Sequence, residues 1–183
     1  MDERFSPLLQ GQGRAAVRPP FRYGQEDREA ILNALRQALE DQPHVAFAYV
    51  HGSFLADRPF HDIDVAVYLD FQATDERNVD LYAQELAFDL EERLRVLLGG
   101  EQDVAQGSAA PSQSTTSPSF PPVDVRALNQ APLGFCYQVC RGHLLVSQDE
   151  TQRVAWVVRV VSRYLDRRPL HRRALKEAMT TCH

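Results

Sequence analysis

The sequence predicts an α+β fold (mixed α/β) in which a small mixed sheet is flanked by helices. Apolar runs of strand length alternate along the chain with longer segments whose apolar residues recur every three or four positions. At 183 residues, 44% of them hydrophobic and 25% charged, the chain can bury one substantial core. No apolar run reaches the roughly 20 residues that a membrane-spanning helix needs, so a globular protein is expected.

The first half of the chain contains two predicted helices and two predicted strands. Apolar spacing predicts an amphipathic helix over Glu26–Leu39, and the run VAFAYV predicts a buried strand over Val45–Val50. Strict alternation over Asp62–Leu69 predicts a second strand, with its polar residues on the face opposite the apolar ones. A long helix is expected over Asn78–Leu98. Its predicted buried side carries Leu81, Leu86, Leu90, Leu94 and Leu97.

The second half repeats the mixture and ends in a helix. Residues Val123–Leu128 have strand character, Ala131–Val139 has helical tendency, and Leu144–Val146 is a short apolar run. A final helix is predicted over Glu150–Asp166, ended by Pro169 and followed by a shorter basic helix. The residues expected on one side of this final helix are Val154, Val157, Val158 and Val161, and Trp156 is interpreted as a core residue.

Composition divides the chain into a lead-in, a domain and an insertion. Residues 1–23 are rich in Gly, Pro and Arg and are expected to be irregular. Residues 24–183 are expected to form a single domain. Within it, the segment at about 101–121 is rich in Ser, Thr, Pro and Gln and has little to bury, which predicts a disordered insertion.

Charge is distributed unevenly along the chain. The net charge is −5, yet residues 141–183 hold nine Arg or Lys against four Asp or Glu. The acidic remainder argues against direct nucleic-acid binding, and the basic end is either a solvated face or a partner surface. Lys176 is the only lysine, so the Gly-Lys of a Walker-type phosphate loop is absent. The three cysteines follow no metal-ligand spacing and no apolar leader is present, which predicts reduced thiols and a cytoplasmic location.

Three aspartates form the candidate catalytic cluster. Residues i and i+2 of a strand share a face about 7 Å apart, so Asp62 and Asp64 lean over one side of the sheet. Asp124 has the same phase on its own strand and joins them if the two strands are neighbours. A divalent cation removes the repulsion between such carboxylates, and all-oxygen ligands suit Mg²⁺. The alternative for the pair alone is turn chemistry, with Asp62 capping a loop.

A Gly-Ser pair and two arginines accompany these aspartates. Gly52 allows close approach of the backbone and Ser53 adds a donor, which suits the phosphates of a nucleotide. Arg58, in the next loop, is either a phosphate contact or a solvated residue. Arg126 shares the predicted face of Asp124 and is either its ion-pair partner or a catalytic group. Together the pattern indicates metal-dependent phosphoryl or nucleotidyl transfer.

The stretch HGSFLADRPFHDIDVAVYLD (residues 51–70) resembles the signature of the minimal nucleotidyltransferases (MNT) of the DNA polymerase beta superfamily. Those proteins carry Gly-Ser, a short helix, and Asp-x-Asp entering a hydrophobic strand. VDVRALNQAPLGFCYQVCRGHLLVSQDE (residues 123–150) resembles their later section, with a third Asp, an Asn-x-x-Pro turn and a Gly-x-Leu-Leu hairpin. The resemblance implies a polymerase-beta-like fold in which ATP phosphates and Mg²⁺ are bound. The implied triphosphate residues are Gly52 and Ser53, and the implied Mg²⁺ ligands are Asp62, Asp64 and Asp124.

The resemblance also implies a partner. Small proteins of this kind pair with a HEPN-type toxin as its antitoxin, which predicts a hetero-oligomer and transfer of AMP from ATP to a toxin tyrosine. Two departures are the short interval between Ser53 and Asp62 and the insertion at about 101–121. Two alternatives stay open at this point: nucleotidyl transfer to a small molecule such as an antibiotic, and a non-catalytic antitoxin that neutralises by binding.

Overall fold

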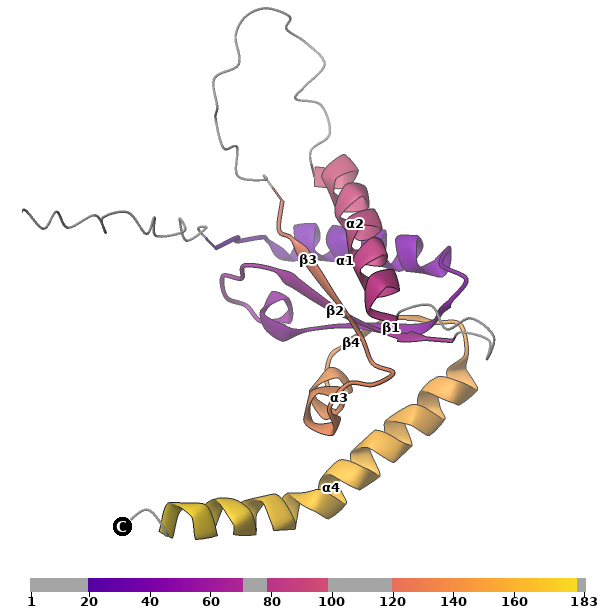
Figure 1. Cartoon of the computed structure of the whole chain (residues 1–183). Coiled ribbons are helices and arrows are strands. Elements are labelled where there is room, and N and C mark those ends of the chain that lie inside the picture. The colour runs from indigo at the N-terminus through magenta and orange to yellow at the C-terminus, as the bar shows by residue number, and fades with distance from the viewer. Residues whose placement is uncertain (1–19, 71–78, 99–119, 181–183) are drawn as a thin grey trace, which may run out of the picture.

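The computed structural model describes residues 20–70, 79–98 and 120–180, with side chains described as far as Pro169. Most of the predicted lead-in (1–23) and of the predicted insertion (101–121) lies outside the described residues. The elements follow in the order α1 (Gln25–Glu40), β1 (Val45–His51), the 3₁₀ turn η1 (Gly52–Leu55), β2 (Ile63–Leu69), α2 (Val79–Leu98), β3 (Val123–Ala127), α3 (Leu133–Val139), β4 (His143–Ser147) and α4 (Glu150–Thr180). The mixture of helices and strands confirms the predicted α+β class (Figure 1).

The four strands form one mixed sheet in the order β3-β2-β1-β4. Strand β1 is antiparallel to both β2 and β4, whereas β2 and β3 are parallel. Every residue of β1 from Val45 to Val50 is buried, because this inner strand has neighbours on both edges and helices over both faces. The parallel pairing of β2 with β3 brings together the two strands that carry the candidate aspartates.

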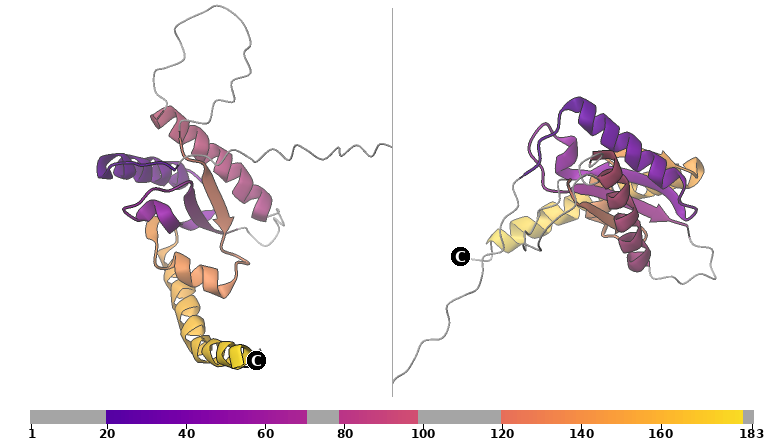
Figure 2. Two further views of the ribbon diagram at one scale, coloured as in Figure 1. Left: turned by 90° about the vertical axis from the view of Figure 1, so that its left-hand side faces the viewer. Right: turned by 90° about the horizontal axis from the view of Figure 1, so that it is seen from above.

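Two helices cover each face of the sheet (Figures 1 and 2). Helices α1 and α2 pack on one face, where Ile31, Leu35, Leu86 and Leu90 belong to one core with the inward side chains of the four strands. Helices α3 and α4 cover the other face. The core there includes Phe47, Tyr49, Ala66, Val139, Trp156 and Val160, which confirms Trp156 as a core residue.

Helix α4 does not end at Pro169, contrary to the sequence-based expectation. It runs from Glu150 to Thr180 with Pro169 inside it, and Figure 1 shows the helix changing direction along its length. Proline lacks the N–H that would bond to the carbonyl four residues earlier, and its ring crowds that carbonyl. A helix can continue past such a site by bending, so the predicted second basic helix is the continuation of α4.

Two predicted apolar faces were partly wrong. On α2 the buried stripe is Ala83, Leu86, Leu90 and Leu94, whereas Leu81 and Leu97 are 53% and 45% exposed. On α4 the buried residues are Trp156 and Val160, while Val154 and Val158 are exposed. In each helix the apolar residues cover more than one face, so spacing alone does not select the face that packs.

The last residues of the predicted irregular lead-in contact the domain. Phe21 forms an isolated antiparallel bridge with Phe60, and its N–H donates to the Phe60 carbonyl at 2.7 Å. Phe21, Tyr23 and Phe60 pack ring to ring, with centroids about 6 Å apart. Among the described residues, no helix is long and apolar enough to cross a membrane.

Asn129 holds the end of β2 against the turn that leads to α3. Its Nδ2 donates to the Leu69 carbonyl at 2.7 Å, and its Oδ1 accepts from the Leu69 N–H at 3.0 Å. We expect Asn129→Ala to lower the free energy of unfolding by about 2 kcal/mol, because two hydrogen bonds are lost. Urea denaturation measures the change. The exposed neighbour Gln130→Ala is the control, and an equal loss there would contradict the clamp.

Candidate functional site

The strand register brings two of the three aspartates side by side. Asp64 is the partner of His51 on β1 and of Asp124 on β3. Val123 and Val125 face the core beneath α1 and α2, so Asp124 faces the opposite side of the sheet. Asp64 alternates with the core residues Ile63 and Val65 in the same way. The two carboxylates therefore share the face that α3 and α4 cover, at the sheet end where β2 and β3 begin.

Electrostatics show that Asp62 belongs to the same cluster. The pKa of the Asp64 carboxyl is raised to about 6, chiefly by burial and then by the neighbouring charges of Asp62 and Asp124. The positive charge of Arg126 lowers the pKa of Asp64. Asp62 lies just before β2 and is half-buried, as is Asp64. The three aspartates that the sequence singled out are thus close enough to influence one another.

Gly52 places the backbone directly against the Asp64 carboxylate. It has a φ of +79°, which side chains of L-residues rarely tolerate. A Cβ added at this position would lie 2.1 Å from Asp64 Oδ2 and 3.0 Å from Asp64 Cγ. Glycine is therefore required here both by backbone conformation and by space. Ser53 follows it in η1, the short helical turn between β1 and the loop before β2.

Arg126 is paired with the third aspartate. Its Nε lies 3.1 Å from Asp124 Oδ2, so the ion pair foreseen from the sequence is present. The Arg126 guanidinium also lies over the Phe135 ring, 5.8 Å from its centroid. Phe135, on α3, also makes an edge-to-face contact with the His51 ring, with the ring centroids 5.3 Å apart.

His51 closes the cluster on the β1 side. Burial lowers the pKa of its imidazole, and the positive charge of Arg126 lowers it further. Its Nε2 is buried without a hydrogen-bond partner among the described residues. This unpaired nitrogen belongs to the residue that pairs with Asp64 in the strand register.

The donor set fits a magnesium ion. Burial raises the pKa of Asp64, and the charges of Asp62 and Asp124 add to the rise, so a cation would relieve the repulsion between these carboxylates. Carboxylate oxygens are ligands of the type that Mg²⁺ prefers. Within 20–70, 79–98 and 120–180, no three His, Cys, Asp or Glu side chains are gathered as a ready-made metal site, and one oxygen of Asp124 is engaged by Arg126. Asp124 must release Arg126 to contribute that oxygen.

Arg28 positions the loop between η1 and β2, a role that the sequence did not reveal. From α1 its guanidinium donates to the carbonyls of Tyr23, Phe54 and Arg58. It also lies over the Phe54 and Phe60 rings, 5.5 and 5.2 Å from their centroids. The predicted phosphate residue Arg58 is exposed on this loop, which Arg28 holds by its main chain. Arg28 looks like an ordinary surface residue of an amphipathic helix, and its partners lie far along the chain.

We expect Arg28→Met to destabilise the protein by about 2 kcal/mol, because charge-assisted bonds to carbonyls are lost while the apolar stem is kept. Thermal unfolding followed by circular dichroism measures the change. Arg22→Met removes an exposed arginine nearby and is the matched control. An equal effect of the two substitutions would show that Arg28 acts through general charge and not through the loop.

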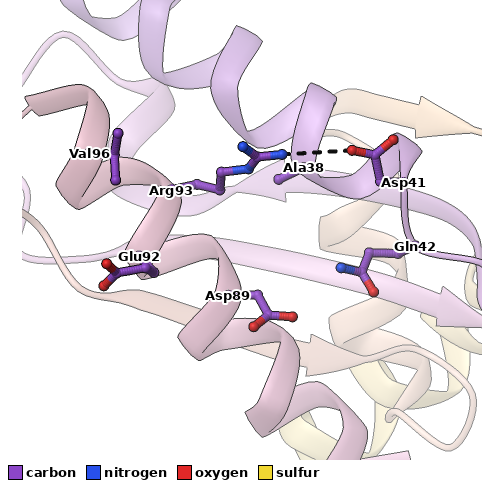
Figure 3. Close-up of a pocket in the computed structure, with 7 residues that line it drawn as sticks. All are labelled: Ala38, Asp41, Gln42, Asp89, Glu92, Arg93 and Val96. Atoms are coloured by element: carbon purple, nitrogen blue, oxygen red, sulfur yellow. Dashed lines mark ion pairs between the residues drawn. The ribbon is translucent and has the colours of Figure 1, made fainter.

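A separate cavity lies between α1 and α2, away from the aspartates. It encloses about 400 Å³ and is lined by Ala38, Asp41, Gln42, Asp89, Glu92, Arg93 and Val96 (Figure 3). Arg93 Nη2 and Asp41 Oδ2 are 3.7 Å apart across it, and both side chains are well exposed. Because α1 and α2 cover the face opposite the Asp64 carboxylate, this cavity plays no part in the candidate site.

Comparison with known proteins supports the fold. Residues 33–113 match the family model described as polymerase beta, nucleotidyltransferase, a span that includes Gly52, Ser53, Asp62 and Asp64. No curated protein matches the sequence. The fold is similar to that of a chain in the tri-AMPylated Shewanella oneidensis HEPN toxin in complex with MNT antitoxin, with TM-score 0.53 and 19% identity, over 83% of this chain and 98% of that one.

A second similar structure is a toxin-antitoxin complex with AMP-PNP. Its TM-score is 0.52 at 20% identity, and the match covers 81% of this chain and 98% of that one. The chain therefore has the fold of these two structures, and residues 33–113 of it match the polymerase beta nucleotidyltransferase model. The first structure is a complex of a HEPN toxin with an MNT antitoxin, and the second is a toxin-antitoxin complex.

Proposed function

We propose that this protein is a Mg²⁺-dependent adenylyltransferase that acts as the antitoxin of a HEPN/MNT pair. In this proposal it transfers AMP from ATP to a tyrosine of its cognate HEPN toxin. The phenolic oxygen forms a bond to the α-phosphorus, the bond to the β-phosphate oxygen breaks, and pyrophosphate leaves as the phenol loses its proton. The fold match, an AMPylated toxin in one similar structure and AMP-PNP in another support this reaction.

The observation that carries the proposal is the pairing of Asp64 with Asp124 across β2 and β3. Asp62 lies just before β2, and the charges of Asp62 and Asp124 add to burial in disfavouring ionisation of Asp64. A purely structural role gives no reason to keep repelling carboxylates close together, whereas a site that binds a divalent cation needs them. We assign Asp62, Asp64 and Asp124 as the residues that would hold Mg²⁺.

The groups of the chain divide the work as follows. Bound Mg²⁺ would supply positive charge that polarises the reacting phosphate. Gly52 lies against Asp64 and Ser53 follows it in η1, and we assign the N–H groups of this turn and the serine hydroxyl to the ATP phosphates. Arg58 lies exposed on the following loop and is assigned to a phosphate contact. Arg126 neutralises Asp124 when the site is free of cation.

The test is label transfer from ATP to the purified cognate toxin. With Mg²⁺, wild-type protein should label the toxin, and Asp62→Ala/Asp64→Ala should not. Absence of labelling by wild type, or equal labelling by the double variant, would contradict the proposal. Mass spectrometry then locates the modified tyrosine.

A non-catalytic antitoxin is the second candidate, favoured by the Asp124–Arg126 pair and by the lack of a ready-made metal site in the described residues. It predicts that the double variant still binds the toxin and still protects cells that express it. A growth-rescue assay with wild type and the double variant separates the two candidates. Rescue by wild type alone supports the enzyme.

A further inference from the structure

A second cavity lies on the same sheet face as the aspartates, but at the other end of β2. It encloses about 220 Å³ between α4, the start of α3 and the residues that end β2 and follow β3. Its walls include the aromatic rings of Tyr68 and Trp156, whose centroids are 6.4 Å apart, and the apolar side chains of Leu133 and Val160. None of the residues that line it is acidic.

Two arginines of α4 complete the lining. Arg159 and Arg163 are exposed and lie four residues apart, so they are neighbours along the helix. Among the described residues no carboxylate pairs with either side chain. Like charges at this spacing repel each other, and a helix would be more stable without the pair. The cavity therefore combines an apolar, aromatic interior with an unneutralised cationic edge.

We propose that this cavity is the docking site for an acidic segment of the partner protein. An apolar or aromatic side chain of that segment would enter against Trp156, and its carboxylates would pair with Arg159 and Arg163. The inference rests on the proposed function, since it takes the HEPN toxin as the partner. It assigns part of the basic end of the chain to partner binding.

A nucleotide fits the cavity less well than a protein segment. Ligand pockets for small molecules typically enclose about 300–1,000 Å³, more than this cavity offers. The glycine turn suited to phosphates is at Gly52, at the opposite end of the sheet face. Arginine and tryptophan are also the residues that most often anchor protein interfaces.

The cavity is well placed to present a partner to the aspartates. Tyr68 and Asp64 alternate onto the same face of β2, four residues and therefore roughly 13 Å apart. Helix α3 borders both the cavity and the candidate site, because Leu133 lines the cavity and Phe135 contacts His51. A segment anchored at Trp156 can continue along α3, so that a nearby tyrosine reaches Asp64.

Binding of the purified cognate toxin tests this inference. The variant is Arg159→Glu/Arg163→Glu, and the control is Arg167→Glu/Arg168→Glu, which makes the same charge change at exposed positions one turn further along α4. We expect the first to weaken toxin binding at least about ten-fold by calorimetry, and the control to change it less than about three-fold. Circular dichroism verifies that both variants fold.

Trp156 reports occupancy directly, because it is the only tryptophan in the chain. In protein labelled with 5-fluorotryptophan, unlabelled toxin should shift the single ¹⁹F resonance, while ATP or inorganic phosphate should not. A shift caused by phosphate instead of toxin would overturn the proposal in favour of a small-anion site.

Other outcomes separate this inference from the proposed function. Equal binding by wild type and Arg159→Glu/Arg163→Glu, or equal weakening by the control, would overturn the docking site and leave the toxin partnership intact. No binding of toxin to wild type would overturn both. If the aspartate variants lose label transfer but bind the toxin normally, the result supports the proposed chemistry and leaves the docking site unaffected.

Discussion

Replacing Asp64 with asparagine is expected to abolish AMP transfer and, at the same time, to stabilise the cation-free protein above about pH 6. The activity loss should be at least about a thousand-fold, because the charge stabilisation supplied by a bound metal is worth several kcal/mol. Asparagine keeps the shape of the side chain but loses the charge that would bind the cation. Label transfer to the toxin measures the first effect.

The stability effect follows from the raised pKa of Asp64. The carboxyl has a pKa of about 6 in the folded protein against 3.8 for an ordinary aspartate, so the folded state holds the proton more tightly. The stability that this proton provides is fully present below about pH 4 and is lost as the pH rises to about 6. Asparagine resembles the neutral form at every pH. Because Asp64 is only half-buried, solvent screening reduces the expected gain at pH 7.5 to about 1 kcal/mol.

Urea denaturation in EDTA at pH 4.5 and pH 7.5 measures this second effect. The gain from Asp64→Asn should be larger at pH 7.5, and added Mg²⁺ should stabilise wild type but not the variant. Asp70→Asn, at the exposed residue just after β2, is the control and should change neither activity nor pH dependence. A loss of stability on Asp64→Asn at pH 7.5 would mean that Asp64 is a structural hydrogen-bond acceptor.

Strand alternation was the part of the site most accessible from the sequence. The direction of a side chain in a strand is local, so the phase of Asp64 and Asp124 could be assigned without knowing their neighbours. The pairing of these two residues could not be assigned from the sequence, because strand order is decided by contacts across the whole sheet. The roles assigned to Asp62, Asp64 and Asp124 stay predictions until the variants are measured.

Long-range contacts account for what the sequence did not reveal. Arg28 reaches carbonyls of η1 and the following loop from a helix that precedes β1, and no local pattern marks that partnership. Leu81 and Val158 carry the apolar character of core residues but are exposed, because the sheet selects which helix face it covers. A proline usually ends a helix, yet α4 continues past Pro169 by bending.

Gly52→Ala is expected to impair both folding and activity, because one methyl group must occupy the position of the Asp64 carboxylate. The φ of +79° alone costs an L-residue about 1–3 kcal/mol. The new Cβ would also approach Asp64 Oδ2 to 2.1 Å, so the carboxylate must move away from its place beside Asp124. We expect a lower melting temperature and a loss of AMP transfer greater than that of Ser53→Ala.

A double-mutant cycle separates the clash from the backbone strain. In an Asp64→Ala background the clash is absent, so Gly52→Ala should cost less free energy of unfolding than in wild type, while the cost of the positive φ remains. Gly134→Ala is the control, because a Cβ there meets nothing within 4 Å and the residue lies in α3, where alanine is the better helix former. Equal costs of Gly52→Ala in the two backgrounds would show that strain alone requires the glycine. A coupling between the two positions would instead show that Gly52 is kept small to give Asp64 its place in the site.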